Sequence, residues 1–421
     1  MLFFYKILTV ALYPFLIVLI LFRRFLGKED WDRFKEKIFF QKKEINANKL
    51  IWFHAASIGE INSIVPVVKY FSEKNENLKI LVTSVTTSSG KIFEYQFKNH
   101  KNIVHKYFPL DISYLIRDFI TKWNPELAVF VDSEIWPNCI FETKKKNIPI
   151  VLLNARITNK TCKRWRLLKN FSKEVFSSFT VCIASSLNSK KNLESLGADN
   201  IEYYGNLKYA DNPKKIEKLK KSLTDSLKNR KVWLAASTHK NEEKFCFDVH
   251  KKLKKEYENI LTIIVPRHIN RVKEIMLEAS SLKLKYQIVK DNSGIIKSDT
   301  EIVLINSFGF LNSYYDYCKN VFIGKSLVKS LILEGGQNPI EAARLGCKIY
   351  HGPYVYNFFE VYEFLKTNKI SEEIRNSEEL SSKIIDDINS QLKIEDSKIK
   401  KIDIFGKDIL NNTIQKLEEF V

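Results

Sequence analysis

The chain has 421 residues, with 68 Lys and Arg against 49 Asp and Glu, and therefore a formal net charge of +19 at pH 7. Its 45% hydrophobic content excludes a disordered protein, and its length is sufficient for two α/β domains. The positive charge favours anionic partners, such as nucleic acid, acidic lipid headgroups or phosphorylated substrates. The six cysteines are scattered without a CxxC pair, so reduced thiols are expected rather than a disulfide framework or a zinc site.

An apolar segment opens the chain. Residues 7–22 contain no charged side chain, and residues 1–5 extend the segment with only Lys6 between them. A helix of about 20 apolar residues can cross a bilayer. The positive-inside rule places the rest of the chain in the cytoplasm, because basic residues follow at once: Arg23, Arg24 and Lys28. We expect residues 1–28 to form a membrane anchor with its basic flank, and this helix either spans the bilayer or lies in the inner leaflet.

A strand, turn and helix signal follows the anchor. Leu50–Phe53 is apolar, and the small residues of 54–59 suit a turn at the end of that strand. Glu60 then begins a helix with apolar residues on one side: Ile61, Ile64, Val65 and Val68. Ligands of α/β folds bind at the carboxyl ends of strands, which makes Glu60 a candidate site residue. The alternative is that Glu60 only favours the helix N-terminus.

Further apolar runs alternate with helical patterns along the whole chain. Such runs are typical of parallel strands that are covered on both faces. The predicted strands are Ile80–Ser84, a short strand near His105–Leu110, Leu127–Val131, Ile148–Leu153, Thr180–Ala184, Val232–Ala236, Leu261–Val265, Tyr286–Val289, Glu301–Ile305, Asn320–Ile323 and Lys348–Gly352.

A lysine-rich stretch at 211–230 separates two such series of strands. We therefore predict an α/β protein with two Rossmann-like, doubly wound domains that face a cleft. The predicted domains are residues 29–205 and 231–400, joined by a hinge at 206–230 and followed by a C-terminal helix at 401–421 that can pack back on the N-terminal domain.

Charged residues follow several of the predicted strands directly. Asp132 and Glu134 come after 127–131, and Lys208 lies near the hinge. Lys208 together with Asp132 or Glu134 completes an acid/base constellation across two domains, or these charges are simply solvated. Arg267 follows the strand at 261–265 and is suited to bidentate phosphate binding, or alternatively to an ion pair between domains.

A glycine-rich stretch at 335–341 precedes a helix, so its backbone N–H groups can bind phosphate, or it is simply a tight turn. The chain contains no GxGxxG motif after the first strand and no GxxxxGK[ST], HExxH or GxSxG motif. His54, His239 and His268 are far apart, and we expect them to line a cleft or cap helices rather than bind a metal. A nucleic-acid partner is not expected, because the aromatic residues fall in strands and in the membrane segment.

Taken together, these segments resemble the 3-deoxy-D-manno-octulosonic acid (Kdo) transferases. This family comprises GT-B glycosyltransferases that move Kdo from CMP-Kdo onto a lipid A precursor. The resemblance covers nearly the whole chain in order and spacing. Besides the N-terminal segment, it rests on HAASIGE (54–60), SEIWPN (133–138), NARIT (154–158), GNLK (205–208), ASTHKNEE (236–243), VPRH (265–268), GKSLV (324–328), GGQNPIEAA (335–343) and GPYVYNF (352–358).

The resemblance implies an N-terminal acceptor domain, a C-terminal CMP-sugar domain and an inverting displacement. It makes Glu60 the base that deprotonates the attacking hydroxyl of the acceptor, and Asp132 and Lys208 the groups that stabilise the transition state. It also implies CMP contacts from Pro266, Arg267, Phe308, Gly309, Phe310, Asn338, Pro339, Ile340 and Glu341. Because CMP carries one phosphate, neither a metal nor another cofactor is expected.

Four positions depart from the family pattern. Asp132 stands where Glu is usual, Gln337 where His is usual, and Lys325 where Gly is usual. The segment 307–310 replaces a typical Gly-Glu-Leu segment, so that Phe310 lacks a carboxylate. Glu60, Lys208 and Arg267 are retained, and an active enzyme is expected.

The predicted function is Kdo transfer from CMP-Kdo to a lipid A precursor in lipopolysaccharide biosynthesis, at the bacterial inner membrane with the catalytic domains on the cytoplasmic side. Anionic inner-leaflet lipid is the expected membrane partner because of the positive charge. Two alternatives remain open: a GT-B transferase for another nucleotide sugar, and a catalytically silent basic membrane protein that binds lipid A.

Overall fold

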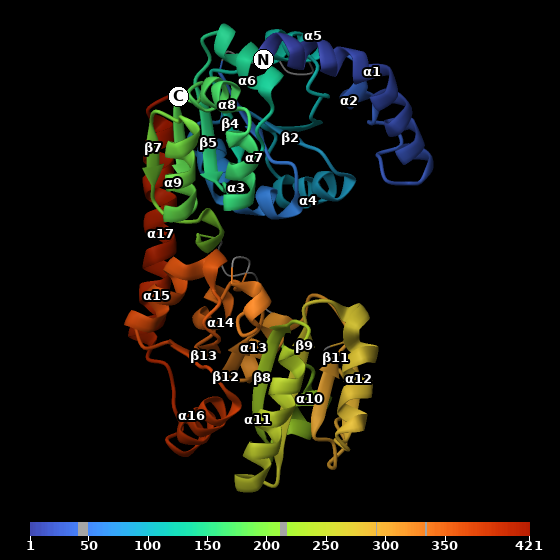
Figure 1. Cartoon of the computed structure of the whole chain (residues 1–421), viewed down its shortest axis with the longest axis vertical. Helices are drawn as coiled ribbons and strands as arrows, with labels where there is room; N and C mark the ends of the chain where they lie inside the picture. Colours follow the sequence, from blue (N-terminus) through green and yellow to red (C-terminus); the bar gives the residue numbers. More distant parts are fainter. Residues whose placement is uncertain (41–48, 211–216, 292, 333–334) are drawn as a thin grey trace. The chain divides into compact units, whose positions relative to one another are not determined.

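The computed structural model describes residues 1–40, 49–210, 217–291, 293–332 and 335–421 (Figure 1). The chain divides into two compact units. Unit 1 comprises residues 1–212 and 405–421, and unit 2 comprises residues 213–404. Parts of the predicted N-terminal domain, at 41–48, and of the predicted hinge, at 211–216, lie outside the described residues.

Unit 1 is built on a seven-stranded parallel sheet of order β3-β2-β1-β4-β5-β6-β7. Its strand order reverses between β1 and β4, so the carboxyl ends of these two strands flank a topological switch point. The strands are β1 (Leu50–His54), β2 (Lys79–Ser84), β3 (Ile103–Tyr107), β4 (Leu127–Val131), β5 (Ile150–Ala155), β6 (Val181–Ala184) and β7 (Ile201–Tyr203).

Helices cover this sheet and bury their apolar sides against it. In α3, the residues expected on the buried side, Ile61, Ile64, Val65 and Val68, are all buried. The helices of unit 1 are α1 (Leu2–Phe25), α2 (Lys35–Ile38), α3 (Ile58–Lys74), α4 (Thr87–Phe97), α5 (Ser113–Trp123), α6 (Pro137–Lys145), α7 (Asn159–Arg166), α8 (Lys169–Phe176), α9 (Leu187–Leu196), the 3₁₀ turn η1 (Leu207–Tyr209) and residues 405–418 of α17 (Asp396–Glu418).

Aromatic side chains fill the core beneath the switch point of unit 1. Trp52 of β1 contacts Phe119 of α5 and Phe130 of β4, with ring centroids 5.0 and 5.3 Å apart. The Trp52 indole also donates a hydrogen bond to the hydroxyl of Thr83. This packing fixes β1 and β4 side by side, and with them the loops that follow each strand.

Unit 2 repeats the architecture with a parallel sheet of order β10-β11-β9-β8-β12-β13-β14. Here the switch point lies between β8 and β12. The strands are β8 (Lys231–Thr238), β9 (Ile260–Pro266), β10 (Tyr286–Val289), β11 (Ile302–Ile305), β12 (Asn320–Ile323), β13 (Lys348–His351) and β14 (Ser371–Glu373). The helical segments are α10 (Lys221–Leu227), α11 (Glu242–Glu256), η2 (Ile269–Arg271), α12 (Val272–Ser281), α13 (Leu311–Tyr317), η3 (Lys329–Leu331), α14 (Ile340–Arg344), η4 (Tyr356–Phe358), α15 (Phe359–Thr367) and α16 (Ser377–Asn389).

The predicted α/β class with two doubly wound domains is therefore confirmed. Two edge strands, β7 and β14, were not predicted. Each has only three residues and carries glutamate, so neither shows the apolar run that identified the buried strands.

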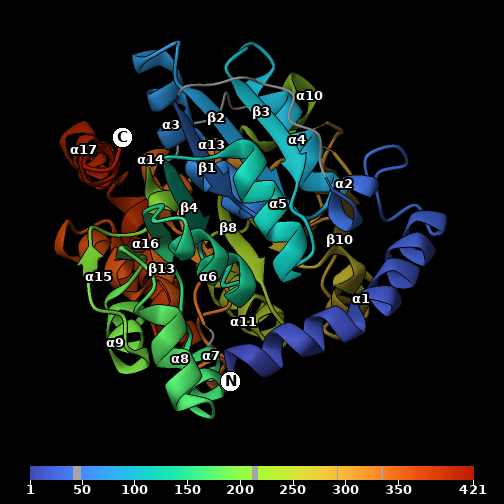
Figure 2. The same cartoon turned by 90° about the horizontal axis from the view of Figure 1, so that it is seen from above.

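The N-terminal apolar segment forms the single helix α1, which is long and apolar enough to cross a membrane. It runs along one side of unit 1, next to α2, α5 and α6 (Figure 1; Figure 2). Polar side chains of α1 have hydrogen-bond partners elsewhere in unit 1.

Candidate active site

Glu60 lies in the first turn of α3, directly after the carboxyl end of β1. Ser57 caps the helix by accepting a hydrogen bond from the Glu60 N–H. The Glu60 carboxylate accepts hydrogen bonds from the Ala56 N–H at 2.7 Å and from the Ser57 hydroxyl at 2.8 Å. Each carboxylate oxygen is thus held by one donor, and the group is fixed at the edge of the sheet.

Asp132 follows β4 on the other side of the switch point. Its Oδ2 pairs with Lys208 Nζ at 2.9 Å, and its Oδ1 accepts a hydrogen bond from the Asn154 amide at 2.6 Å. The Asn154 Oδ1 in turn accepts the Leu207 N–H at 3.0 Å, so one amide side chain holds both the carboxylate and the loop that carries the lysine. The ends of β4, β5 and β7 are thereby joined into one polar network.

Glu134 lies two residues beyond Asp132 and has a different set of partners. Its Oε2 contacts His54 Nε2 at 3.3 Å and accepts a hydrogen bond from the Trp136 indole at 2.9 Å. The His54 ring is buried, with its Nδ1 on the Thr83 hydroxyl. Although burial opposes its ionisation, the hydrogen bonds from His54 and Trp136 lower the pKa of Glu134.

The three carboxylates are close enough to influence one another. Burial raises the pKa of Glu60 above its usual range, and the negative charges of Glu134 and Asp132 raise it further, while the hydrogen bond from Ser57 opposes the increase. A carboxylate with a raised pKa is a stronger base, and bases of this kind gather at catalytic sites.

Two residues of this network adopt left-handed backbone conformations. Asp132 has φ +56° and Asn154 has φ +53°. Such conformations are costly for most side chains, although Asn and Asp tolerate them best, and they concentrate at functional sites. The strained pair forms the hydrogen bond at the centre of the network, which points to a function of this edge beyond stability.

In unit 2, a buried carboxylate at the switch point binds the loops that follow β8 and β12. Glu242, at the start of α11, is fully buried and accepts four backbone N–H groups, from His239, Lys325, Ser326 and Leu327, at 2.7–3.0 Å. Gly324 leaves room for it, because a Cβ there would lie 2.7 Å from Glu242 Oε2. Glu242 was not predicted as a site residue, and its only sequence signal was its place within the 236–243 motif.

The predicted donor-binding residues occupy loops at the carboxyl edge of the same sheet. Pro266 ends β9, and Arg267 follows with its side chain exposed and its N–H bonded to the Thr238 carbonyl. The rings of His239 and His268 lie beside this position, with centroids 5.8 Å apart. Burial lowers the pKa of His239, and the charges of Lys325, His268 and Arg271 lower it further.

The two other predicted donor-binding segments are residues 308–310, which follow β11, and residues 338–341, which run into the first turn of α14. Phe308 is 69% exposed, Gly309 has φ +94°, and Phe310 lies directly before α13. Asn338 caps the backbone N–H of Ile340, Pro339 is buried, and Glu341 is exposed. The loops that precede α14 are tied together, because the Gly336 N–H donates to the Lys325 carbonyl at 2.6 Å.

The structure thus joins Asp132 and Lys208 directly and places Glu60 within electrostatic reach of Asp132. Arg267, residues 308–310 and residues 338–341 follow different strands of unit 2, and no hydrogen bond or ion pair between described residues joins Arg267 to the other two segments. No group of three or more His, Cys, Asp or Glu side chains among the described residues could hold a metal ion. The absence of a cofactor stays a prediction.

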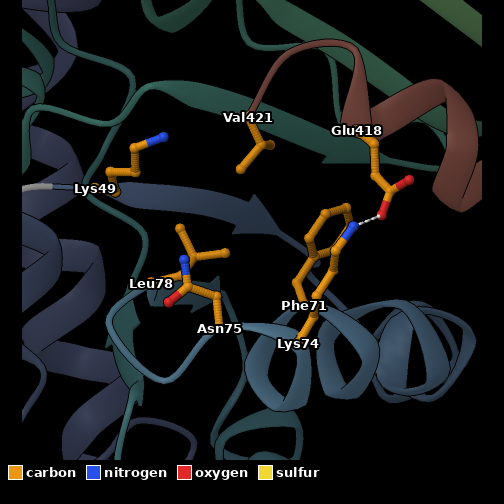
Figure 3. Close-up of a pocket in the computed structure, with 7 residues that line it drawn as sticks. All are labelled: Lys49, Phe71, Lys74, Asn75, Leu78, Glu418 and Val421. Carbon is orange, nitrogen blue, oxygen red and sulfur yellow. Dashed lines mark hydrogen bonds and ion pairs between the residues drawn. The ribbon is translucent and has the colours of Figure 1, made fainter.

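A separate pocket of about 280 Å³ lies at the opposite, amino end of the unit 1 sheet (Figure 3). Lys49 and Leu78, which line it, precede β1 and β2. Lys74 of α3 forms an ion pair there with Glu418 of α17. Because Glu60 follows the carboxyl end of β1, this pocket belongs to the other end of the sheet and not to the carboxylate site.

Comparisons with known proteins agree with the geometry. A family model described as 3-deoxy-D-manno-octulosonic-acid transferase (kdotransferase) matches residues 32–211. The 3-deoxy-D-manno-octulosonic acid transferase of Rickettsia bellii is 31% identical over 378 residues, which cover 89% of this chain and 88% of the relative. The enzyme of the same name from Haemophilus influenzae is 30% identical over 321 residues, which cover 75% of this chain and 73% of the relative.

Among solved structures, a putative UDP-N-acetylglucosamine 2-epimerase from Listeria monocytogenes aligns with a TM-score of 0.58 at 14% identity. The alignment covers 89% of this chain and 98% of that chain, and it supports the fold alone. The sequence matches cover most of the chain, so they identify the family as well as the fold. The chain belongs to the 3-deoxy-D-manno-octulosonic acid transferase family of glycosyltransferases and has the GT-B fold.

Proposed function

We propose that this enzyme transfers Kdo from CMP-Kdo to a lipid A precursor at the cytoplasmic face of the inner membrane, with Glu60 as the general base. The observation that carries the proposal is the Glu60 carboxylate. It is fixed at the switch point of unit 1, and burial and neighbouring negative charges raise its pKa. The family assignment supports Kdo as the transferred sugar.

The reaction is a single displacement at the anomeric carbon. The oxygen of an acceptor hydroxyl attacks the anomeric carbon of Kdo, and the bond from that carbon to the phosphate oxygen of CMP breaks. The hydroxyl proton passes to Glu60, and CMP leaves with the bonding electron pair, so the configuration inverts. Two lone-pair positions of Glu60 accept hydrogen bonds from Ala56 and Ser57, which leaves others for the acceptor hydroxyl.

Lys208 and Asp132 are proposed to act as a positioned ion pair beside this base. In the pair, Lys208 supplies a positive charge that can approach the negative charge developing on the substrates, while Asp132 and Asn154 hold its loop in place. Asp132 is one methylene shorter than the usual Glu, and its contact with Lys208 at 2.9 Å supports the view that it keeps this role.

On the donor side, we propose that Arg267 binds the phosphate of CMP. Its side chain is exposed at the carboxyl end of β9, and a guanidinium suits bidentate phosphate binding. Pro266, residues 308–310 and residues 338–341 are proposed to contact the rest of CMP. The Glu242 network supports this arrangement by fixing the loop 324–327.

The test is Kdo transfer by the full chain, with CMP-Kdo generated in situ and a tetraacylated lipid A precursor as the acceptor. Glu60→Gln keeps the size of the side chain but removes the base, so we expect a loss on the order of 10²–10⁴ in rate. Glu73→Gln is the matched control, because Glu73 lies exposed near the other end of α3. Product mass counts the Kdo residues that are added.

Full activity of Glu60→Gln would assign the base to another carboxylate, with Asp132 and Glu134 as the next candidates. No product from the folded parent enzyme would refute Kdo transfer from CMP-Kdo. The same assay with UDP-linked sugars then tests the alternative donor, and salt-sensitive binding of the lipid without turnover would identify a silent lipid-binding protein.

A further inference from the structure

The helix α1 has two contrasting sides. The residues that face unit 1 recur at helical spacing, and they include the polar side chains of Tyr5, Lys6, Thr9 and Tyr13. The exposed side is apolar along its length. It comprises Phe3, Phe4, Ile7, Leu8, Val10, Leu12, Phe15, Val18, Leu19, Leu21 and Phe22. This distribution is the reverse of a helix on a water-exposed surface, where the apolar side faces the protein.

Polar contacts fasten the N-terminal half of α1 to unit 1. Lys6 pairs with Glu142 of α6 at 2.8 Å, and the Tyr5 hydroxyl donates to Asp111 at 2.9 Å. The Thr9 hydroxyl accepts a hydrogen bond from the buried Asn138 at 3.1 Å. These partners lie more than 100 residues away in the sequence.

The residues that bind the polar side chains of α1 belong to a buried hydrogen-bond network within unit 1. Glu142 is only 4% exposed, and Ser113 also hydrogen-bonds its carboxylate. Although burial opposes ionisation, the hydrogen bonds from Lys6 and its other neighbours lower the pKa of Glu142 to about 2. Asp111 also accepts the backbone N–H groups of Asn138 and Cys139 at the start of α6.

The middle and the C-terminal end of α1 are fastened as well. The Tyr13 hydroxyl donates to the carbonyl of Ile38, and its ring lies 5.7 Å from that of Tyr114. Ile20 packs into a small apolar cluster with Phe34 and Ile38. Contacts with the rest of unit 1 are therefore spread along the helix from Tyr5 to Ile20.

We propose that α1 lies in the plane of one leaflet as a helix clamped along unit 1, with its apolar side in lipid, and does not cross the bilayer. This inference rests on the membrane attachment in the proposed function. Length alone does not separate the two arrangements, because 24 residues extend about 36 Å and the hydrocarbon core is about 30 Å thick.

The contacts between α1 and unit 1 do distinguish a spanning helix from an in-plane helix. A spanning helix leaves the domain at its C-terminal end, so only the contacts near Ile20 would survive. Lys6 would then lose Glu142 and enter or cross the hydrocarbon, and the buried carboxylates would lose their donors. An in-plane helix keeps every one of these contacts and places only apolar side chains in lipid.

A second exposed apolar surface lies next to the N-terminal part of α1. Leu167 and Leu168, at the corner between α7 and α8, are exposed, and Leu167 is 83% exposed. The corner adjoins α1, because the ring of Phe171 in α8 lies 5.8 Å from Tyr5 and 6.2 Å from Trp165. The exposed basic residues around the two leucines suit anionic headgroups: Lys163, Arg164, Arg166 and Lys169.

The clamp also places the membrane beside the candidate active site. α6, which binds Lys6 through Glu142, begins directly after the loop that contains Asp132 and Glu134. An acceptor lipid in the same leaflet would therefore present its headgroup near the carboxyl edge of the unit 1 sheet without leaving the membrane.

The test measures the depth of single fluorophores in the bilayer. All six native cysteines are buried, so a thiol introduced on the surface is the one that reacts. Phe4→Cys, Phe15→Cys and Phe22→Cys report along α1, Leu167→Cys reports on the α7–α8 corner, and Tyr95→Cys of α4 is the exposed control. The labelled full chain is reconstituted into phosphatidylcholine and phosphatidylglycerol vesicles that carry quenchers at shallow or deep acyl positions.

We expect the three α1 labels and the Leu167 label to be quenched mainly by the shallow lipid, to similar extents, and the Tyr95 label not to be quenched. Deepest quenching at Phe15 together with no quenching at Leu167 would overturn the proposal in favour of a spanning helix. No quenching at any position would overturn it as well, because α1 would then face water. The readout does not involve transfer, so its outcome is independent of whether CMP-Kdo is the donor.

Discussion

Asn154 holds the two halves of the candidate catalytic network together, and its removal should disable the site without a direct change to any proposed catalytic group. Its amide donates to Asp132 at 2.6 Å, and its carbonyl oxygen accepts the N–H of the buried Leu207 at 3.0 Å. Lys208, the next residue, pairs with the same Asp132. Asn154→Ala therefore frees the carboxylate and the lysine loop at once.

The expected cost can be worked out from these contacts. A hydrogen bond to a charged group contributes about 1.5–3 kcal/mol, and a buried N–H without a partner costs about 1–3 kcal/mol. Asn154 has φ +53°, and alanine tolerates that conformation less well than asparagine does. We expect local destabilisation of about 2.5–6 kcal/mol, taking the two hydrogen-bond terms together.

Hydrogen exchange of the full chain measures this local effect, because the two units need not unfold together. Peptides that cover residues 201–209 should exchange faster in Asn154→Ala by a factor on the order of 10² or more. Peptides that cover β12 in unit 2 serve as the internal control. Transfer should fall mainly in kcat, because Lys208 is displaced rather than removed.

Asn154→Asp sharpens the test, since it keeps the acceptor for Leu207 but places an oxygen against Asp132. Two carboxylates so close share a proton, which raises the apparent pKa of the pair. The protonated pair restores the hydrogen bond that the amide makes, so this variant should lose activity as the pH rises through that apparent pKa. Unchanged exchange in Asn154→Ala and an unchanged pH profile in Asn154→Asp would refute the positioning role.

Three further predictions follow from single contacts. Glu134→Gln removes a negative charge that raises the pKa of Glu60, so the acidic limb of the pH–rate profile, where Glu60 becomes protonated, should move to lower pH; a shift to higher pH would contradict the coupling. Gly205→Ala places a Cβ 2.7 Å from Ile409 Cδ1 at φ +110°, and thermal unfolding should show destabilisation of about 1–3 kcal/mol, with a lower kcat because the Lys208 loop moves. Lys325→Gly relieves a left-handed lysine at φ +59°, so the melting temperature should not fall, and a raised KM for CMP-Kdo would identify a role of this side chain in donor binding.

The sequence predicted most of the fold, because buried parallel strands are apolar runs that alternate with helices. It also placed Asp132 at a strand end and Lys208 near the hinge, although nothing in their spacing revealed the ion pair across 76 positions. Asn154 and Glu242 were not predicted as site residues. Their side chains accept hydrogen bonds from backbone N–H groups of loops and turns that are distant in the sequence, and such contacts leave no local pattern.

The helix α1 is the clearest example of a feature that the local sequence pattern does not determine. An apolar segment followed by arginines satisfies the rules for a spanning helix, and Lys6 within it would be explained by its reach toward the headgroups. What distinguishes a clamped helix is that Glu142, Asp111 and Asn138 meet its polar side, and their place in the fold brings them there. The same α6 that receives Lys6 begins where the Asp132 loop ends. One short helix therefore links the candidate lipid-facing surface to the candidate catalytic edge, and on the proposed arrangement we expect a change in how α1 meets the bilayer to change where the acceptor meets Glu60.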